Sequence, residues 1–431
     1  MTLWLSTLRI QFYYTYPTNT DITLTHNDSM QFPAVTICNV NPISLSALRN
    51  PRVKTSYLTR ILTSIERTPN INITVEDWDD LVDDSYFNNI DGDRAAYLEI
   101  QGLYMNLSED ERRTYGHQLD TMMLSCVFNE YRCSPLNFSY FHNPKHGNCF
   151  VFNSGANDPI LTTQHSGSTY GLSLELYIEH NDYIASLAND AGIRIEIHNQ
   201  THMPFPEDYG YSLFPGARNS IGISMVEIRR EIYPYGDCNK YTDDENTRLN
   251  AYVDTVNLPI HYSDKACKKT CYQRQMISQC GCCLTEYPCV SKATTRVWTR
   301  YCNFTLRADG KNDNYDMCSD LCHETVFSTE ISMNMWPSNP HMRNYVLNPH
   351  ITYNFDLLTS RENVLKLDVY YKDLNYESID TSYSYAADSL LSDIGGQLGL
   401  WLGLSVVTLF EFVELVFDCI ILLLRRCRCR E

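Results

Sequence analysis

Cysteines constrain the fold of this chain more than any other residue type. Fourteen of the seventeen lie between Cys38 and Cys322, and Cys419, Cys427 and Cys429 follow near the C-terminal end. The chain up to Cys322 carries six N-x-S/T sequons, which are glycosylation acceptors in secreted proteins, at Asn27, Asn72, Asn106, Asn137, Asn199 and Asn303. An even number of cysteines alongside sequons favours a disulfide framework formed in an oxidising compartment.

Zinc binding is the competing interpretation of these cysteines, because CKKTC and CSDLC pair them at short spacing. No C-x2-C pairs recur at the spacing of a zinc finger, and a thiolate site suits a reducing compartment better. We therefore expect no metal site.

Composition and motifs argue against several function classes. The 431 residues are 43% hydrophobic, which supports a sizeable folded core. A net charge of -18 opposes nucleic-acid binding, which needs basic surface against phosphates. The sequence contains no G-x-S-x-G, no H-E-x-x-H and no phosphate-binding loop, so we expect neither an enzyme nor a cofactor.

The segment LGLWLGLSVVTLFEFVELVFD, residues 398–418, is apolar enough to enter a bilayer. We expect a membrane helix over residues 389–424, followed by a basic cytoplasmic tail, RRCRCRE, at 425–431. Basic residues favour the cytoplasmic side, so the residues before this helix are expected outside the cell. The sequence therefore predicts a plasma-membrane protein with one complete transmembrane helix in this chain.

The same segment carries Glu411, Glu414 and Asp418, whose spacings of three and four residues place them on one helical face. On insertion scales each mid-membrane acid costs about 2.5 to 3.5 kcal/mol, so this face should not contact lipid. Several copies of the helix around water would hydrate the acids and attract cations. In the alternative interpretation the acids lie beyond the hydrocarbon at the cytoplasmic end. This alternative suits Asp418 better than Glu411.

Small residues precede these acids at Gly395, Gly399 and Gly403. A stripe of this kind permits tight packing or dimerisation of membrane helices, which is the simpler interpretation. The stripe leads, however, to Gly403, Leu404 and Ser405, where glycine can open backbone carbonyls and serine adds a hydroxyl. Such oxygens can replace part of the hydration shell of a small cation, so the segment favours a cation pathway.

Longer stretches carry a resemblance to a known family. LLSDIGGQLGLWLGLSVVTLFEFVE resembles the second transmembrane segment of the epithelial sodium channel, degenerin and acid-sensing channel family, including its G-x-S selectivity motif. FPAVTICNVN resembles the first palm strand of that family, and HGNCFVFN resembles a later strand. ETVFSTEISMNMWPS resembles the stretch that closes the thumb, and LKLDVYYKDLNYESI resembles the strand leading into the pore helix.

This resemblance covers nearly the whole chain and implies an α+β membrane protein. A disulfide-rich extracellular domain of palm, β-ball, knuckle, finger and thumb would stand on transmembrane helices. Three subunits would form a homotrimer or a family heterotrimer in the lipid bilayer, and each full-length subunit would cross the membrane more than once.

The resemblance also implies domain boundaries. Residues 1–14 match the outer remnant of a first transmembrane helix, and 15–388 match the extracellular cysteine-rich domain, with the thumb at about 238–335. Residues 389–424 match the second transmembrane pore helix. The His-Gly gating motif that the family places before its first helix has no counterpart here, so the possibility of a longer parent subunit stays open.

The disulfide pattern of the family, carried over position by position, implies six bridges: Cys38–Cys149, Cys126–Cys133, Cys238–Cys322, Cys267–Cys318, Cys280–Cys302 and Cys282–Cys289. Cys271 and Cys283 are left over. Asp316 stands where the family has the usual partner of Cys271, and we expect Cys283 to replace that partner.

The resemblance implies an amiloride-sensitive sodium channel subunit. Gly403, Leu404 and Ser405 match the selectivity filter, and Gly399 matches the amiloride-blocking position. Ser392 and Asp393 fall in the gate region, where small residues at the position of Ser392 favour closure in the family. Sodium ions are the implied permeant partner.

The trigger for opening is less constrained. FYYTYPTNTDITLTHNDSMQFPAVTICNVNP resembles FMRFamide-gated invertebrate channels more than proton-gated ones. An acidic ectodomain with 31 tyrosines offers groups complementary to a positively charged, aromatic peptide. We therefore expect opening by an FMRFamide-like neuropeptide. The alternatives are proton gating, constitutive or mechanical gating within the same family, and a single-pass cysteine-rich receptor.

Overall fold

The computed structural model describes residues 2–49, 100–101, 104, 107–156, 158–241, 249–253, 256–280, 287, 318–340, 361–402 and 406–428. The chain divides into two compact units. Unit 1 comprises Met1–Thr23, Arg229–Asn239 and Ile379–Glu431, and unit 2 comprises Leu24–Ile228 and Lys240–Ser378.

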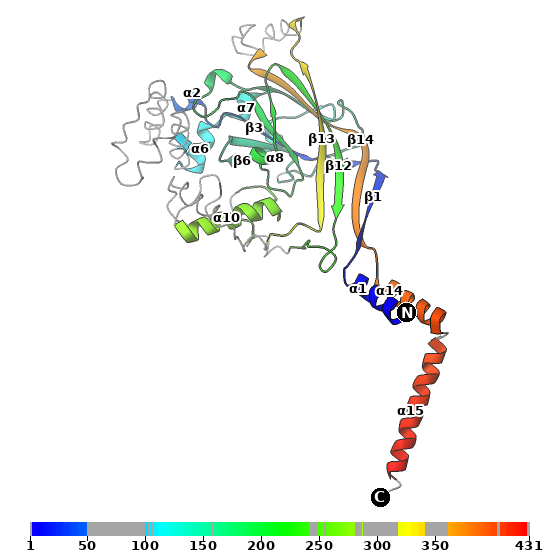
Figure 1. Ribbon diagram of the computed structural model, residues 1–431. Coiled ribbons are helices and arrows are strands. Elements are labelled where there is room, and N and C mark those ends of the chain that lie inside the picture. Colours follow the sequence, from blue (N-terminus) through cyan, green and yellow to red (C-terminus); the bar gives the residue numbers. More distant parts are fainter. Residues whose placement is uncertain are drawn as a thin grey trace. The chain divides into compact units, whose positions relative to one another are not determined.

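Within the described residues, the larger sheet has seven strands. Its order is β13-β12-β14-β9-β4-β5, and β1 also pairs with β14. The strands are β1 (Thr18–His26), β4 (Met123–Phe128), β5 (Tyr131–Arg132), β9 (Leu172–Tyr177), β12 (Ala217–Arg229), β13 (His323–Met335) and β14 (Val364–Tyr383). Figure 1 shows β12, β13 and β14 as long strands running side by side.

A second sheet, of five strands in the described part of the chain, has the order β11-β10-β3-β7-β6. Its strands are β3 (Ala34–Asn39), β6 (Phe138–Asn143), β7 (Gly147–Phe152), β10 (Ile193–His198) and β11 (Tyr211–Leu213). Every residue of β3 and β7 is buried. A two-stranded pair, β2 (Met30–Gln31) with β8 (Thr162–Thr163), completes the sheets.

The two faces of this second sheet contribute to two different hydrophobic clusters, because side chains alternate along a strand. Val35 and Ile37 of β3 join the main core. Ala34 and Cys38 join a second cluster that includes Phe205. Burial on both faces explains why β3 reads as a continuous apolar run rather than an alternating one.

The described part of unit 2 also contains helices and 3-10 turns. They are α2 (Leu45–Leu48), α6 (Glu109–Tyr115), α7 (Leu119–Met122), α8 (Pro206–Tyr209), α10 (Asp264–Cys280), and the 3-10 turns η3 (Pro135–Asn137) and η4 (His180–Asp182). The sequence specifies the start of α6 through a capping box. Ser108 accepts from the backbone N–H of Glu111, whose carboxylate accepts from the backbone N–H of Ser108.

Unit 1 contains three long helices: α1 (Thr2–Tyr13), α14 (Ala387–Leu402) and α15 (Val406–Arg428). α1 and α14 lie side by side (Figure 1). The helix expected over 389–424 thus corresponds to α14 and α15, and residues 403–405 lie outside the described residues. In the part of the chain that the structure describes, no helix meets the combined requirements of length and apolarity for a membrane span.

Three of the expected disulfides are present: Cys38–Cys149, Cys126–Cys133 and Cys267–Cys318. Cys38 and Cys149 are direct partners in the register of β3 and β7, with Cα atoms 4.4 Å apart. Cys238 and Cys322 are each disulfide-bonded. Cys282, Cys283, Cys289 and Cys302 lie outside the described residues, as does the side chain of Cys280.

One expected disulfide needs correction. Cys271 is a free thiol rather than the partner of Cys283, because it lies one helical turn after Cys267 and its sulfur lies against the Cys267–Cys318 bridge. Residues 323–335, which include the stretch matched to the end of the thumb, form β13 and pair with β12 in the seven-stranded sheet.

Candidate gate and pore segment

Asp393 is the centre of a polar contact between α1 and α14. Arg9 Nε lies 3.3 Å from Asp393 Oδ2, and the Tyr385 hydroxyl donates to the same oxygen at 2.7 Å. One turn further along α14, the Ser6 hydroxyl donates to Gln397 Oε1 at 3.3 Å. These contacts join the two helices through residues nearly the whole chain apart.

Exposure makes this contact weak. The Arg9 side chain is 50% exposed and that of Asp393 is 38% exposed. Solvent-exposed ion pairs contribute about 0.2 to 1 kcal/mol. The contact can therefore form in one state of unit 1 and break in another at little cost.

Aromatic side chains continue the contact toward the start of α14. The rings of Phe12 and Tyr385 meet edge to face, with centroids 5.3 Å apart. A further series runs from Tyr16 to Tyr235, at 5.4 Å, and from Tyr235 to Tyr383, at 5.7 Å. Such pairs contribute about 0.5 to 1.5 kcal/mol each beyond area burial, so they hold three segments of unit 1 together.

The sequence predicted Asp393 and Ser392 here, and the structure places both on α14, with Ser392 exposed. The partners Arg9 and Tyr385 were not predicted from the sequence. The available signal was Arg9 itself, a lone charge within an otherwise apolar stretch, because such residues in membrane segments usually pair with another polar group.

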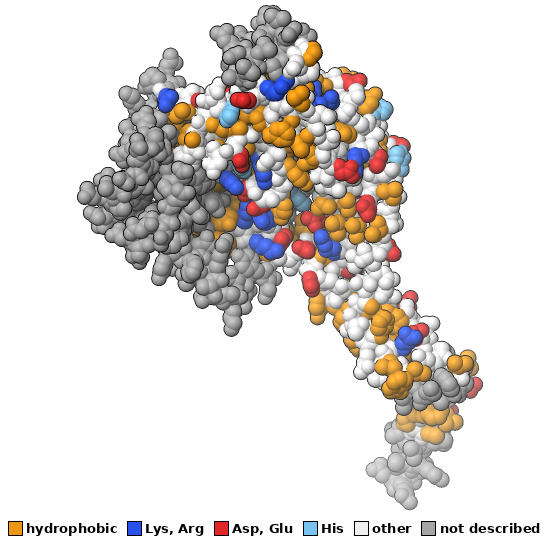
Figure 2. Space-filling view, turned by 45° about the horizontal axis from the view of Figure 1, so that its top comes forward, with side chains coloured by type: hydrophobic (Ala, Val, Ile, Leu, Met, Phe, Trp, Pro, Cys, Tyr) orange, Lys and Arg blue, Asp and Glu red, His pale blue; other side chains and the backbone are white. Residues whose placement is uncertain are grey.

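The three predicted pore acids all lie on α15 and are all exposed: Glu411, Glu414 and Asp418. Large apolar side chains of the same helix are exposed as well, with Phe410 at 71% and Phe412 at 66%. Figure 2 shows hydrophobic side chains gathered over the helical part of the chain. Exposed apolar surface of this kind is typical of a site that contacts another protein or a membrane.

The remaining predicted sites have mixed outcomes. Gly399 lies on α14, exposed, whereas Gly403, Leu404 and Ser405 lie outside the described residues. Of the sequons, those at Asn27 and Asn137 are exposed, and that at Asn199 is half-buried. The sequons at Asn72, Asn106 and Asn303 lie outside the described residues.

Unit 2 contains a second cluster of charged groups, where α8 meets α10. Lys269 Nζ lies 2.6 Å from Glu207 Oε1 and 2.9 Å from Asp208 Oδ2. The same ammonium group lies 4.0 Å from the centre of the Phe205 ring. Lys269 therefore links α10 to α8 by ion pairs and contacts Phe205, just before α8, by a cation–π interaction.

Glu196 of β10 lies beside this cluster and is only 5% exposed. Its Oε2 has no hydrogen-bond partner among the described residues. Burial raises the pKa of the Glu196 carboxyl to about 8, and the neighbouring Glu207 carboxylate adds to the increase. This carboxyl can bind or release a proton near neutral pH, which makes it the strongest candidate for a pH-sensitive group in unit 2.

A cavity of about 440 Å³ also lies in unit 2. Its lining includes His202, His261, His323, Glu324, Tyr241 and Tyr262. Burial lowers the pKa of His202, which Glu324 partly opposes. The lining thus includes two tyrosine rings and one carboxylate, groups that suit a cationic, aromatic ligand.

Comparisons with known proteins place these features in context. The sequence model described as "Amiloride-sensitive sodium channel" matches residues 1–415. The alpha subunit of the epithelial sodium channel from Cavia porcellus is 27% identical over 502 residues, covering 100% of this chain and 72% of the relative. The human alpha subunit is 27% identical over 511 residues, covering 99% of this chain and 75% of the relative.

The beta subunit from Neoceratodus forsteri is 32% identical over 333 residues, covering 75% of this chain and 50% of the relative. Members of this family are sodium channels of the plasma membrane rather than enzymes. Because the family match extends over nearly the whole sequence, the chain belongs to the amiloride-sensitive sodium channel family.

Proposed function

We propose that this chain is a pore-lining subunit of an amiloride-sensitive sodium channel, with a gate at the contact between α1 and α14. The observation that carries the gate is the position of Asp393 between Arg9 and Tyr385. A weak ion pair between two helices is suited to a gate, because a few tenths of a kcal/mol shift its population.

The acids of α15 support a cation pathway. Glu411, Glu414 and Asp418 share one helical face and are exposed in the isolated chain. Three copies around an axis would place these carboxylates around water, where they attract sodium ions, and would leave exposed aromatic residues on the other side of the helix, such as Phe412, to contact lipid. This proposal includes the trimer and the filter at Gly403, Leu404 and Ser405.

Three alternatives are proposed for how the channel opens. Opening by an FMRFamide-like peptide is supported by the cavity in unit 2, whose tyrosines and Glu324 complement a cationic aromatic ligand. The relatives compared above are named as epithelial sodium channel subunits, which supports the alternative of a channel that conducts without a neuropeptide. Proton gating is the remaining alternative, and the buried Glu196 is the observation that favours it.

Expression of the full chain in oocytes tests the function and separates the triggers. Currents would be recorded before and after an FMRFamide-like peptide, after acidification, and then with amiloride. We expect an inward sodium current that amiloride blocks. A rise in current with peptide alone supports peptide gating, and a rise with acid alone supports proton gating. A current that is present before either peptide or acid is added supports constitutive opening.

Gly399→Cys tests whether this chain itself lines the pore. We expect weaker block by amiloride, because a side chain would occupy the position matched to the blocking site. Gly395→Cys, one helical turn earlier on the same helix, is the matched control and should keep normal block. Unchanged block in Gly399→Cys, or no current from cells that display the chain at their surface, would contradict the proposal.

A further inference from the structure

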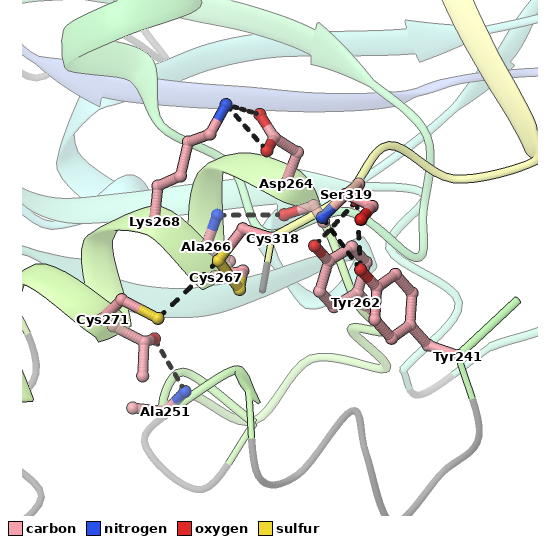
Figure 3. Close-up of a disulfide and its surroundings, with 12 residues drawn as sticks. Tyr241, Ala251, Tyr262, Asp264, Ala266, Cys267, Lys268, Cys271, Cys318 and Ser319 are labelled. Carbon is pink, nitrogen blue, oxygen red and sulfur yellow. Dashed lines mark hydrogen bonds and ion pairs between the residues drawn. A yellow bond between two sulfur atoms is a disulfide. The ribbon is translucent and has the colours of Figure 1, made fainter. Parts of the chain in front are cut away.

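Three sulfur atoms meet where α10 contacts the segment before β13. Cys267 and Cys318 form a disulfide, and Cys271 is a free thiol. The Cys271 sulfur lies 3.7 Å from the Cys318 sulfur, and the three sulfur atoms lie within 4.8 Å of one another. Figure 3 shows the Cys271 sulfur directed toward the bridge.

Helix geometry brings the two α10 sulfurs to one partner. Cys267 and Cys271 are four residues apart, so their side chains lie on the same face of α10, one turn apart. Both therefore reach Cys318 from one side. Cys267 is fully buried, whereas Cys271 is half-buried.

The position of Cys318 does not depend on the bridge alone. The backbone N–H of the next residue, Ser319, donates to the Tyr241 hydroxyl at 3.0 Å, and its carbonyl accepts from the Tyr262 hydroxyl at 2.9 Å. The two tyrosine rings stack with centroids 3.6 Å apart. Figure 3 shows these contacts on the side of Cys318 opposite Cys271. They would hold Cys318 in place while its bond partner changes.

We propose that these three cysteines form a thiol–disulfide exchange site, in which Cys318 is bridged to either Cys267 or Cys271. The Cys271 thiol loses its proton, and the resulting thiolate attacks the Cys318 sulfur. A Cys271–Cys318 bond forms as the Cys267–Cys318 bond breaks, and Cys267 leaves as a thiolate that takes up a proton. The reaction conserves electrons and needs neither an oxidant nor a reductant.

The exchange requires little movement of the sulfurs. A bonded pair lies at about 2 Å, so the Cys271 sulfur must approach Cys318 by roughly 1.7 Å. The anchor of the bridge on α10 then moves by one turn, about 6 Å along the helix axis. Exchange therefore changes which part of α10 is tied to the segment entering β13.

The protonation state of the Cys271 thiol limits the rate of the exchange. Burial raises the pKa of the Cys271 thiol, although Arg274 acts in the opposite direction. Only the thiolate attacks a disulfide, so the exchange proceeds through a small ionised fraction and is slow at neutral pH.

Disulfide mapping of the full chain tests the exchange. The protein would be purified without reductant, quenched in acid, alkylated with N-ethylmaleimide under denaturing conditions, and digested with trypsin and an Asp-specific protease. Trypsin separates Cys267 from Cys271 at Lys268 and Lys269, and cleavage before Asp320 separates Cys318 from Cys322. In the wild-type chain we expect peptides with the Cys271–Cys318 bridge and alkylated Cys267, beside the major isomer with alkylated Cys271.

Cys267→Ser is the decisive variant, and Cys267→Ser with Cys271→Ser is its control. We expect the single variant to form the Cys271–Cys318 bridge and to keep a thermal midpoint near that of the wild type. The double variant should form no bridge to Cys318 from α10 and should unfold at a lower temperature than the wild type. If Cys267→Ser yields alkylated Cys271 and alkylated Cys318, the exchange site is excluded.

Wild-type mapping decides the question if Cys267→Ser is not recovered as folded protein. Alkylated Cys267 alongside a Cys271–Cys318 peptide would then support the exchange. Alkylation confined to Cys271, or a bridge between Cys271 and Cys283, would overturn it.

Discussion

Two carboxylates of this chain have contrasting surroundings. Asp393 in unit 1 is 38% exposed and has two partners, Arg9 and Tyr385. Glu196 in unit 2 is 5% exposed, and its Oε2 has no hydrogen-bond partner within the described residues. Asp393 is held by its interaction partners, whereas burial sets the pKa of Glu196. The proposed gate thus consists of exposed groups with a weak interaction, whereas the raised pKa of Glu196 results from burial.

Among the tests of this contrast, a substitution in the charged cluster around Lys269 should change stability the most. Lys269→Met keeps the apolar stem of the side chain over Phe205 but removes the ammonium group from Glu207 and Asp208. Because Lys269 is only 10% exposed, we expect a loss of about 3 kcal/mol in stability, the range for a broken buried ion pair. Thermal unfolding of the solubilised full chain would measure it.

Lys268→Met is the matched control, on the preceding residue of α10. Lys268 is 46% exposed and pairs only with Asp264 among the described residues, so its loss should cost less than about 0.5 kcal/mol. Equal destabilisation by the two variants would show that burial does not distinguish these lysines.

Glu196→Gln tests the role of burial at the second carboxylate. The pKa of Glu196 is about 8 in the folded chain, above its usual value of 4.5. The folded state therefore binds the proton more tightly than the unfolded state. Its stabilising contribution is fully present below about pH 4.5 and is lost as the pH rises through about 8. Glutamine resembles the protonated acid at every pH, so the variant should lose this part of the pH dependence and unfold at a higher temperature at pH 8.

Thermal midpoints measured between pH 5 and 8.5 would show the effect, because this range covers roughly the interval between the unfolded and folded pKa values of Glu196. Glu330→Gln is a suitable control, because Glu330 is 74% exposed and pairs with Lys372 at the surface. A slope with pH that is the same in Glu196→Gln and the wild type would refute the assignment. The same variant sharpens the gating question, since proton gating through Glu196 predicts loss of the acid response.

The features of this chain that could be predicted from its sequence depend on local pattern or on family resemblance. The strand around Cys38, the bridge to Cys149 and the acidic face of α15 follow from alternation, family resemblance and helical spacing. Glu196 did not follow, because IRIEIH reads as a half-buried strand with its acid in solvent. Its burial arises from α8 and α10 covering the second face of the sheet, which no local pattern encodes.

The partners at the gate were also beyond local pattern. Arg9 and Asp393 come together only because α1 and α14 pack side by side. Cys271 shows the converse failure: Asp316 stands in place of its usual partner in the family, and its pairing with Cys283 was inferred only because both cysteines were left over. The helix face places Cys271 against an existing bridge instead.

The exposed contact at the gate should show the smallest energetic effect. Arg9→Gln or Asp393→Asn removes about 0.2 to 1 kcal/mol of contact, which corresponds to a change of up to about fivefold in the closed–open ratio. We expect a higher open fraction in both variants, read from the amiloride-sensitive current per channel at the surface. The charge-exchanged pair, Arg9→Asp with Asp393→Arg, should restore part of the wild-type ratio. Absence of any coupling between the two positions would remove this ion pair from the gate.

The most direct test of the proposed channel is the response of Ser392→Cys to a bulky thiol reagent. Ser392 is exposed on α14 beside Asp393, so a reagent can reach an introduced thiol. With a gate at this position, modification should produce a sustained, amiloride-sensitive sodium current in Ser392→Cys and none in the wild type. An unchanged current, after mass spectrometry has verified that the introduced thiol is labelled, would contradict the account.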